Sequence, residues 1–160
     1  MRFGYTALYV GLIVAVNYAF SVVPLVELPG GTMWPPVALL VGFVFVARDF
    51  AQREIGHRVI LAMLAGAVIS YVMADPFVAV ASAAAFLVSE FADWAVYTYT
   101  RRPLSQRILF SSILSAPIDS AVFLGLVGIL SPAGVAAMTV SKLLGAVVVW
   151  WMVRRREATA

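Results

Sequence analysis

The sequence predicts an all-α membrane protein, a bundle of six transmembrane helices with both termini in the cytoplasm. Composition and the placement of positive charge support this prediction. Of the 160 residues, 63% are hydrophobic and 12% are charged, whereas soluble domains carry roughly 25% charged residues. Such a chain has too few polar side chains to cover a soluble surface and is too hydrophobic for intrinsic disorder. It contains no cysteine, which excludes disulfide frameworks, thiolate zinc sites and cysteine nucleophiles.

Six apolar segments follow one another and are separated by short connections, four of which carry turn-forming residues. A transmembrane helix needs about 20 predominantly apolar residues. The predicted spans cover residues 3–23, 35–50 (extending at most to 56), 58–74, 77–98, 106–130 and 132–153. The turn signals are Pro29-Gly30-Gly31, Asp75-Pro76, Arg102-Pro103 and Ser131-Pro132. We interpret residues 1–160 as one integral membrane domain.

Positive charge alternates along this pattern. Ten of the eleven basic residues fall on one side of a six-span arrangement: Arg2, Arg48, Arg53, Arg58, Arg101, Arg102, Arg107, Arg154, Arg155 and Arg156. The positive-inside rule makes that side cytoplasmic. A secretory signal cleaved near Ala19 is the other interpretation of the first segment, but no A-x-A site follows it.

Three charged residues lie at membrane depth. Glu90, Asp119 and Lys142 fall within about 5 Å of the predicted midplane at 1.5 Å per residue. A charge at a helix centre costs about 2.5–3.5 kcal/mol on insertion scales. Lys142 either forms a structural ion pair with Glu90 or Asp119, or belongs to a binding site. Two acids against one base leave one acid to be protonated, solvated or bound to a ligand.

The fifth predicted span carries a polar stripe. Ser112, Ser115, Asp119 and Phe123 are spaced by three or four residues and share one helical face. Pro117 frees backbone carbonyls beside that face. The stripe indicates a binding site, unless the serines merely hydrogen-bond their own helix and Pro117 is a simple kink.

The fourth span places two carboxylates between two aromatic side chains. Glu90, Asp93, Trp94 and Tyr97 share a face, which is suited to stacking a flat ring and accepting its N–H groups. The aromatic pair is also typical of an interfacial belt. Asn17, the only amide of the first span, belongs to the site or forms an interhelical hydrogen bond.

The connection after the second span holds three further candidates. Arg48 and Asp49 lie deep enough for a gate or a binding role, and Asp49 is predicted to pair with Arg53 four residues later. The other interpretation is a plain cytoplasmic cap. Gly56 is predicted to end the helix.

Catalytic and metal-binding motifs are absent from the sequence. It contains no H-E-x-x-H, G-x-S-x-G or Walker A pattern, and one histidine without cysteine argues against a structural zinc site. We therefore expect no enzyme, no metal, no cofactor and no nucleic-acid partner, and expect membrane lipid and a small solute as partners.

Several of these motifs together resemble a known family. They are Arg48-Asp49 with Gln52 and Gly56, the run Ser89-Glu90-Phe91-Ala92-Asp93, and Ser111-Ser112-Ile113-Leu114-Ser115 followed by Asp119-Ser120 and Phe123. The chain resembles the queuosine precursor transporter family, also called the vitamin uptake transporter family, from the second span to the sixth. Many members are longer, and those often place an acid where Arg53 stands.

The resemblance implies a six-helix protein of the bacterial inner membrane that imports 7-deazaguanines, notably 7-cyano-7-deazaguanine. It implies that Glu90, Asp93, Ser112, Ser115 and Asp119 line the substrate path. A carboxylate accepts the paired N–H donors of such a ring bidentately, as it accepts arginine.

The residues do not decide which acid binds the substrate ring or which aromatic side chain stacks on it. Asp119 or Glu90 is the candidate acid, and Trp94, Trp34 or Phe123 is the candidate stacking partner.

Two other hypotheses remain at this point. The chain is alternatively the substrate-binding subunit of an energy-coupling-factor-type vitamin importer, docking through the small residues Gly11, Ala15 and Ala19, or a purely structural membrane protein. The same stripe leaves homo-oligomer formation open.

Overall fold

The computed structural model describes residues 3–29 and 31–159. The described residues form the helices α1 (Gly4–Val22), α2 (Ala38–Ile55), α3 (Val59–Met73), α4 (Ala79–Tyr99), α5 (Leu104–Val127) and α6 (Pro132–Ala158). A 3₁₀ turn, η1 (Gly56–Arg58), joins α2 to α3, and a hairpin of β1 (Val26–Leu28) and β2 (Thr32–Trp34) joins α1 to α2.

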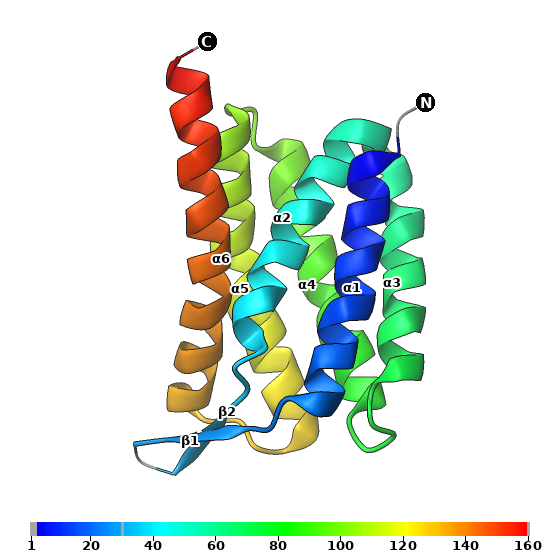
Figure 1. The fold of residues 1–160 in the computed structure, drawn as a ribbon, viewed down its shortest axis with the longest axis vertical. Coiled ribbons are helices and arrows are strands. Elements are labelled where there is room, and N and C mark those ends of the chain that lie inside the picture. The colour runs from blue at the N-terminus through cyan, green and yellow to red at the C-terminus, as the bar shows by residue number, and fades with distance from the viewer. Residues whose placement is uncertain (1–2, 30, 160) are drawn as a thin grey trace.

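The helices pack side by side along the long axis of the molecule (Figure 1). Both ends of the chain lie at one end of the bundle, and the hairpin lies at the other. The all-α prediction is confirmed apart from the hairpin, where the sequence predicts only a turn. β1 and β2 are antiparallel, with Leu28 opposite Thr32, and Gly31 adopts φ +77° in the turn. Glycine tolerates this left-handed conformation because it lacks a Cβ atom.

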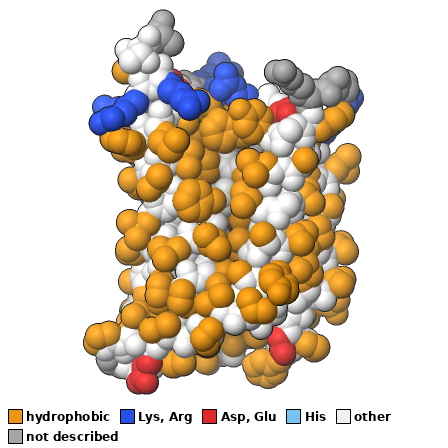
Figure 2. All heavy atoms as spheres, in the orientation of Figure 1, with side chains coloured by type: hydrophobic (Ala, Val, Ile, Leu, Met, Phe, Trp, Pro, Cys, Tyr) orange, Lys and Arg blue, Asp and Glu red, His pale blue; other side chains and the backbone are white. Residues whose placement is uncertain are grey.

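Five segments are long and apolar enough to cross a membrane: Gly4–Val22, Ala38–Met73, Ala79–Tyr99, Leu104–Val127 and Pro132–Ala158. The second of these contains both α2 and α3, which run in opposite directions in Figure 1. The chain reverses at Gly56, where φ is +62° and α2 ends, as predicted. The face of the bundle seen in Figure 2 is covered by hydrophobic side chains, and arginine side chains gather at the end that holds the termini. This surface is typical of a protein surrounded by lipid.

Helix α6 extends beyond its predicted end. It continues to Ala158 and therefore includes Arg154, Arg155 and Arg156 in its last turns. The guanidinium groups of Arg154 and Arg155 lie 5.2 and 3.6 Å from the ring centroids of Trp150 and Trp151. Cations near a helix C-terminus interact favourably with the helix dipole, which accounts for the added turns.

The start of α1 is tied to the end of α2 by Glu54. Its Oε2 accepts hydrogen bonds from the Thr6 backbone N–H at 2.9 Å and from Thr6 Oγ1 at 2.8 Å. A carboxylate at a helix N-terminus satisfies free N–H groups and complements the dipole. This contact fixes α1 against the α2–α3 pair at the end that holds the termini.

Helices α2 and α6 approach each other closely at Gly42. A Cβ atom built on Gly42 would collide with the backbone carbonyl of Lys142 and would lie 3.3 Å from the Cα atom of Gly145. Glycine inside a helix is about 1 kcal/mol less favourable than alanine. The close contact between these two backbones explains its presence.

Gly42→Ala is expected to push α2 away from α6 and to lower the free energy of unfolding by about 1–3 kcal/mol, the range typical of overpacking. Gly11→Ala is the matched control, because Gly11 is exposed on α1 and no described atom lies within 4 Å of its built Cβ. Thermal unfolding of the detergent-purified variants measures the difference. Equal stability of the two variants would contradict a tight α2–α6 crossing.

Candidate functional site

The interior of the bundle contains two separate groups of buried polar side chains. The first, which we call the Lys142 pair, is the ion pair of Lys142 and Asp119 with the hydroxyls of Ser89 and Ser120. The second, which we call the Arg48 cluster, comprises Arg48, Asp49, Glu90 and Asp93. The two groups differ in their access to space inside the protein.

The Lys142 pair joins α6 to α5 and α4. Lys142 Nζ lies 2.5 Å from Asp119 Oδ2 and donates to Ser120 Oγ at 2.9 Å. Ser89 Oγ donates to Asp119 Oδ1 at 3.0 Å. The Lys142 side chain is 1% exposed and that of Asp119 is 15% exposed. The ion pair was one of the two predicted alternatives for Lys142, and Asp119 rather than Glu90 is its partner.

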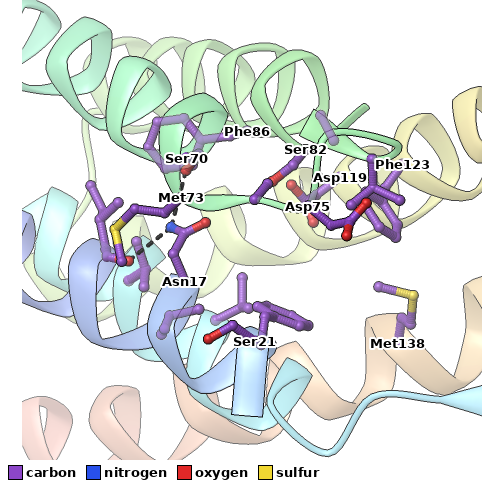
Figure 3. A pocket seen from close by; sticks show the side chains of 18 of the residues that line it. Asn17, Ser21, Ser70, Met73, Asp75, Ser82, Phe86, Asp119, Phe123 and Met138 are labelled. Carbon is purple, nitrogen blue, oxygen red and sulfur yellow. Dashed lines mark hydrogen bonds between the residues drawn. The ribbon is translucent and has the colours of Figure 1, made fainter. Parts of the chain in front are cut away.

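A cavity of about 500 Å³ lies beside the Lys142 pair. Every one of the helices α1 to α6 contributes to its wall, which includes Lys142 of α6. Figure 3 shows Asp119 on one side of the cavity and Asn17 of α1 on another. The other polar lining residues are Ser21, Ser70, Asp75 and Ser82. Small-molecule sites usually measure about 300–1,000 Å³ and are mostly apolar with a few polar groups. The cavity therefore has the size and the lining of such a site.

The cavity reaches the surface at the hairpin end of the bundle. Ser21, in the last turn of α1, and Asp75, between α3 and α4, are both exposed and both line it. Its apolar wall includes Phe20, Phe86 and Phe123. The described lining residues thus connect the Lys142 pair to the end of the molecule opposite the termini.

Asn17 forms the predicted interhelical hydrogen bond. Its Nδ2 donates to the Ile13 carbonyl at 2.8 Å and to Ser70 Oγ at 3.2 Å, which links α1 to α3. The same side chain lines the cavity. Because these hydrogen bonds fix the amide, it presents a polar group of fixed orientation to anything in the cavity.

The Arg48 cluster is sealed from solvent. Arg48 Nη2 lies 2.7 Å from Asp49 Oδ1 and 2.6 Å from Asp93 Oδ2, and Arg48 Nε lies 3.8 Å from Glu90 Oε2. All four side chains are 0% exposed.

Neighbouring polar side chains complete this cluster. Tyr9 on α1 donates to Glu90 Oε2 at 2.8 Å, and Ser111 on α5 donates to Asp49 Oδ2 at 3.1 Å. Arg48 Nη1 also donates to Gln52 Oε1.

Two sequence predictions about this region require correction. Asp49 pairs with Arg48 instead of Arg53, because Asp49 is buried against Ser111 of α5 whereas Arg53, near the end of α2, is exposed. Glu90 belongs to the Arg48 cluster and does not line the cavity. Asp119 and Glu90 therefore lie in different sites, although the sequence presents them as alternatives for one.

Among the aromatic candidates, Phe123 alone lines the cavity. Trp94 makes edge contacts with the rings of His57 and Tyr99 and does not line the cavity. Trp34 Nε1 donates to Ser141 Oγ at 2.8 Å, which ties the hairpin to α6.

The two candidate serines of α5 also lie away from the cavity. Ser112 and Ser115 are fully buried, and their Oγ atoms have no hydrogen-bond partner among the described residues. Neither hydroxyl bonds a carbonyl of its own helix. The alternative in which these two serines merely hydrogen-bond their own helix is therefore not supported.

Sequence reasoning missed Tyr9, whose hydroxyl reaches the Arg48 cluster. A signal was present, because Tyr9, Ile13 and Asn17 are spaced by four and therefore share a face of α1. Within residues 3–29 and 31–159, no group of three or more His, Asp or Glu side chains is placed to hold a metal ion. In comparisons with protein-family models, curated proteins and solved structures, nothing matches this chain.

Proposed function

We propose that this chain is a six-span carrier of the bacterial cytoplasmic membrane that takes up a flat, N–H-bearing heterocycle of the 7-deazaguanine class. The antiparallel course of α2 and α3 supports six crossings. Residues 56–73, which form η1 and α3, give about 27 Å of helix at 1.5 Å per residue, close to the roughly 30 Å hydrocarbon core. The gathering of basic residues at the end with both termini supports a cytoplasmic position for that end.

The observation that carries the proposal is the cavity beside Asp119. Asp119 retains 15% exposure although it pairs with Lys142, so a carboxylate oxygen remains close to any solute in the cavity. The paired N–H donors of a deazaguanine ring suit such a carboxylate, and Phe123 provides an apolar surface for the ring. The family resemblance of the α4 and α5 motifs supports the choice of this ring.

The position of the cavity supports uptake as the direction of transport. Its opening lies at the hairpin end, which is the outer end in the proposed orientation. The Arg48 cluster fills the interior on the cytoplasmic side. This arrangement corresponds to a state open to the outside, and release would require the helices to rearrange around the site, as in alternating access.

Thermal stabilisation of the purified protein tests the substrate class. A ligand at one hundred times its Kd is expected to raise the free energy of unfolding by about 2.7 kcal/mol. We expect 7-cyano-7-deazaguanine to stabilise the wild type more than guanine or a pterin does. The variant Glu27→Gln is a control that should be stabilised by the ligand as much as the wild type is, because Glu27 is exposed on β1 and does not line the cavity. If no deazaguanine stabilises the wild type, the proposed substrate class is wrong.

One observation favours the alternative of a binding subunit that needs an energy-coupling partner. Gly11 and Ala15 are exposed on α1, so two members of the small-residue stripe are free to contact another membrane protein. Uptake by this chain alone, in a host lacking such a partner, would establish an independent carrier. Uptake that appears only with the partner would establish the alternative.

A further inference from the structure

We propose that the Arg48 cluster is a proton-binding site, with Glu90 as the proton carrier, and that it couples proton movement to passage of the solute held at Asp119. The proton site stands on the geometry of the cluster. The coupling rests on the proposed carrier function.

The charges of the Arg48 cluster do not balance. Three carboxylates surround one guanidinium, so full ionisation would leave a net charge of −2 among side chains that are 0% exposed. Each uncompensated buried ion costs several kcal/mol. Binding one proton forms an O–H bond on a carboxylate and lowers the excess charge from −2 to −1, and no other reactant is required.

Buried atoms without partners show where a proton fits. Glu90 Oε1 and Asp93 Oδ1 are buried and accept no hydrogen bond from any described residue. Asp93 and Asp49 lie within 2.7 Å of the guanidinium of Arg48, whereas Glu90 is 3.8 Å from it. Glu90 is therefore the acid least compensated by Arg48, and its Oε1 is the proposed proton position.

Other titratable groups lie in the cluster with Glu90 and in the layer of Tyr97 next to it. They are Tyr9 on α1, Arg48 and Asp49 on α2, Asp93 and Tyr97 on α4, and Arg107 on α5. The α3 residues Val59 and Met63, which pack in the same core as Tyr9, are apolar. Tyr9 donates to Glu90 Oε2 and leaves Oε1 free.

Tyr97 separates the cluster from the cytoplasmic end. Its ring centroid lies 5.5 Å from the Arg48 guanidinium and 5.3 Å from that of Arg107, and the residue is only 5% exposed. Gln52 Nε2 donates to Thr98 Oγ1 at 2.8 Å beside it. Movement of this layer would give Glu90 access to cytoplasmic water.

Helix α4 connects the proton site to the solute site. Ser89 donates to Asp119 in the Lys142 pair, and the next residue, Glu90, lies in the Arg48 cluster. A shift of α4 therefore changes both sites at once. This provides a physical route by which a change of charge at Glu90 alters the position of Ser89 against Asp119.

Infrared spectroscopy of the purified protein tests the proton site without any solute. At neutral pH the wild type is expected to show the C=O stretch of a protonated, buried carboxylic acid, shifted by exchange into D₂O. Glu90→Gln should remove that band, and Glu27→Gln should retain it. Absence of the band in the wild type, or its persistence in Glu90→Gln, would overturn the assignment.

Tyr9→Phe provides a second test of the proton site in case Glu90→Gln fails to fold. It removes the hydroxyl bonded to Glu90 Oε2 but keeps the acid and the ring. This variant is expected to retain the band and to change the pH at which it disappears. An unchanged titration would show that the proton does not reside on Glu90.

Coupling is measured in lipid vesicles that contain a pH-sensitive dye. With external 7-cyano-7-deazaguanine, the wild type is expected to take up solute and acidify the vesicle interior. Glu90→Gln should still be stabilised by the solute but should lose acidification. Solute uptake without acidification in the wild type would overturn coupling and leave the carrier function standing. Absence of both solute uptake and ligand stabilisation would overturn the carrier function and with it the coupling, while the infrared band alone decides the proton site.

Discussion

Replacing Arg48 by methionine is expected to lower the free energy of unfolding by about 3–5 kcal/mol, the range for removing one partner of a buried ion pair. Arg48 is the cation within reach of Asp49, Glu90 and Asp93, and all four side chains are fully buried. Methionine keeps a similar length but leaves three acids without compensation. Chemical or thermal unfolding in detergent measures the loss.

Arg53→Met is the matched control for this substitution. Arg53 lies on the same helix five residues later and is exposed, so its replacement should change stability by no more than about 0.5 kcal/mol. Arg48→Lys retains the positive charge and is expected to recover part of the loss. If Arg48→Met and Arg53→Met are equally stable, the cluster does not hold the bundle together.

The second large effect concerns the Lys142 pair and separates stability from binding. Lys142→Met alone leaves Asp119 unpaired, and Asp119→Leu alone leaves Lys142 unpaired, so each single variant is expected to lose about 3 kcal/mol or more. The double variant removes both charges and should regain most of the wild-type stability, because apolar replacements of buried ion pairs are often neutral. Thermal unfolding of the three variants and the wild type gives a double-mutant cycle, which measures the interaction energy between Lys142 and Asp119.

The same double variant is expected to bind solute poorly despite its stability. Loss of a charge-assisted acceptor removes roughly 1.5–3 kcal/mol, which corresponds to roughly a 10- to 150-fold rise in Kd for 7-cyano-7-deazaguanine. Titration of the thermal shift against ligand concentration measures that rise. A double variant that is stable and still binds with wild-type affinity would show that the pair serves packing alone.

The proposed proton site and the proposed solute site predict different signatures for these variants. Glu90→Gln should affect the infrared band and proton coupling while the solute still stabilises the protein. Asp119→Leu with Lys142→Met should affect the solute while the band persists. This contrast follows from the structure, because Glu90 lies outside the cavity wall and Asp119 forms part of it.

Much of the fold was predictable because membrane insertion leaves strong local signals. Apolar segment length and turn residues placed the helices to within a few residues, and Gly56 ended α2 as expected. Helix α6 was predicted too short, because a hydropathy criterion ends at the first arginine whereas the helix continues into the basic turn. The hairpin was not predicted, because strands of three residues leave no periodic signal.

The candidate site was predictable only in part. Helical spacing correctly placed Asp119 and Phe123 on one face, and both line the cavity. The same spacing placed Trp94 with Glu90, but Trp94 packs against His57 and Tyr99. A shared face on one helix covers a wide arc, and the packing of neighbouring helices decides which part of that arc meets a cavity.

By itself, the sequence determined that this protein is helical, where its apolar segments lie and which charged residues sit deep within them. Those properties depend on residue type and on neighbours along one helix. Only the tertiary structure decided that Lys142 pairs with Asp119 and that three acids surround Arg48. It also decided that a cavity adjoins the Lys142 pair and not the Arg48 cluster. The reason is that a buried charge takes the partner that helix packing brings within about 4 Å, and residues far apart in the chain supply that partner.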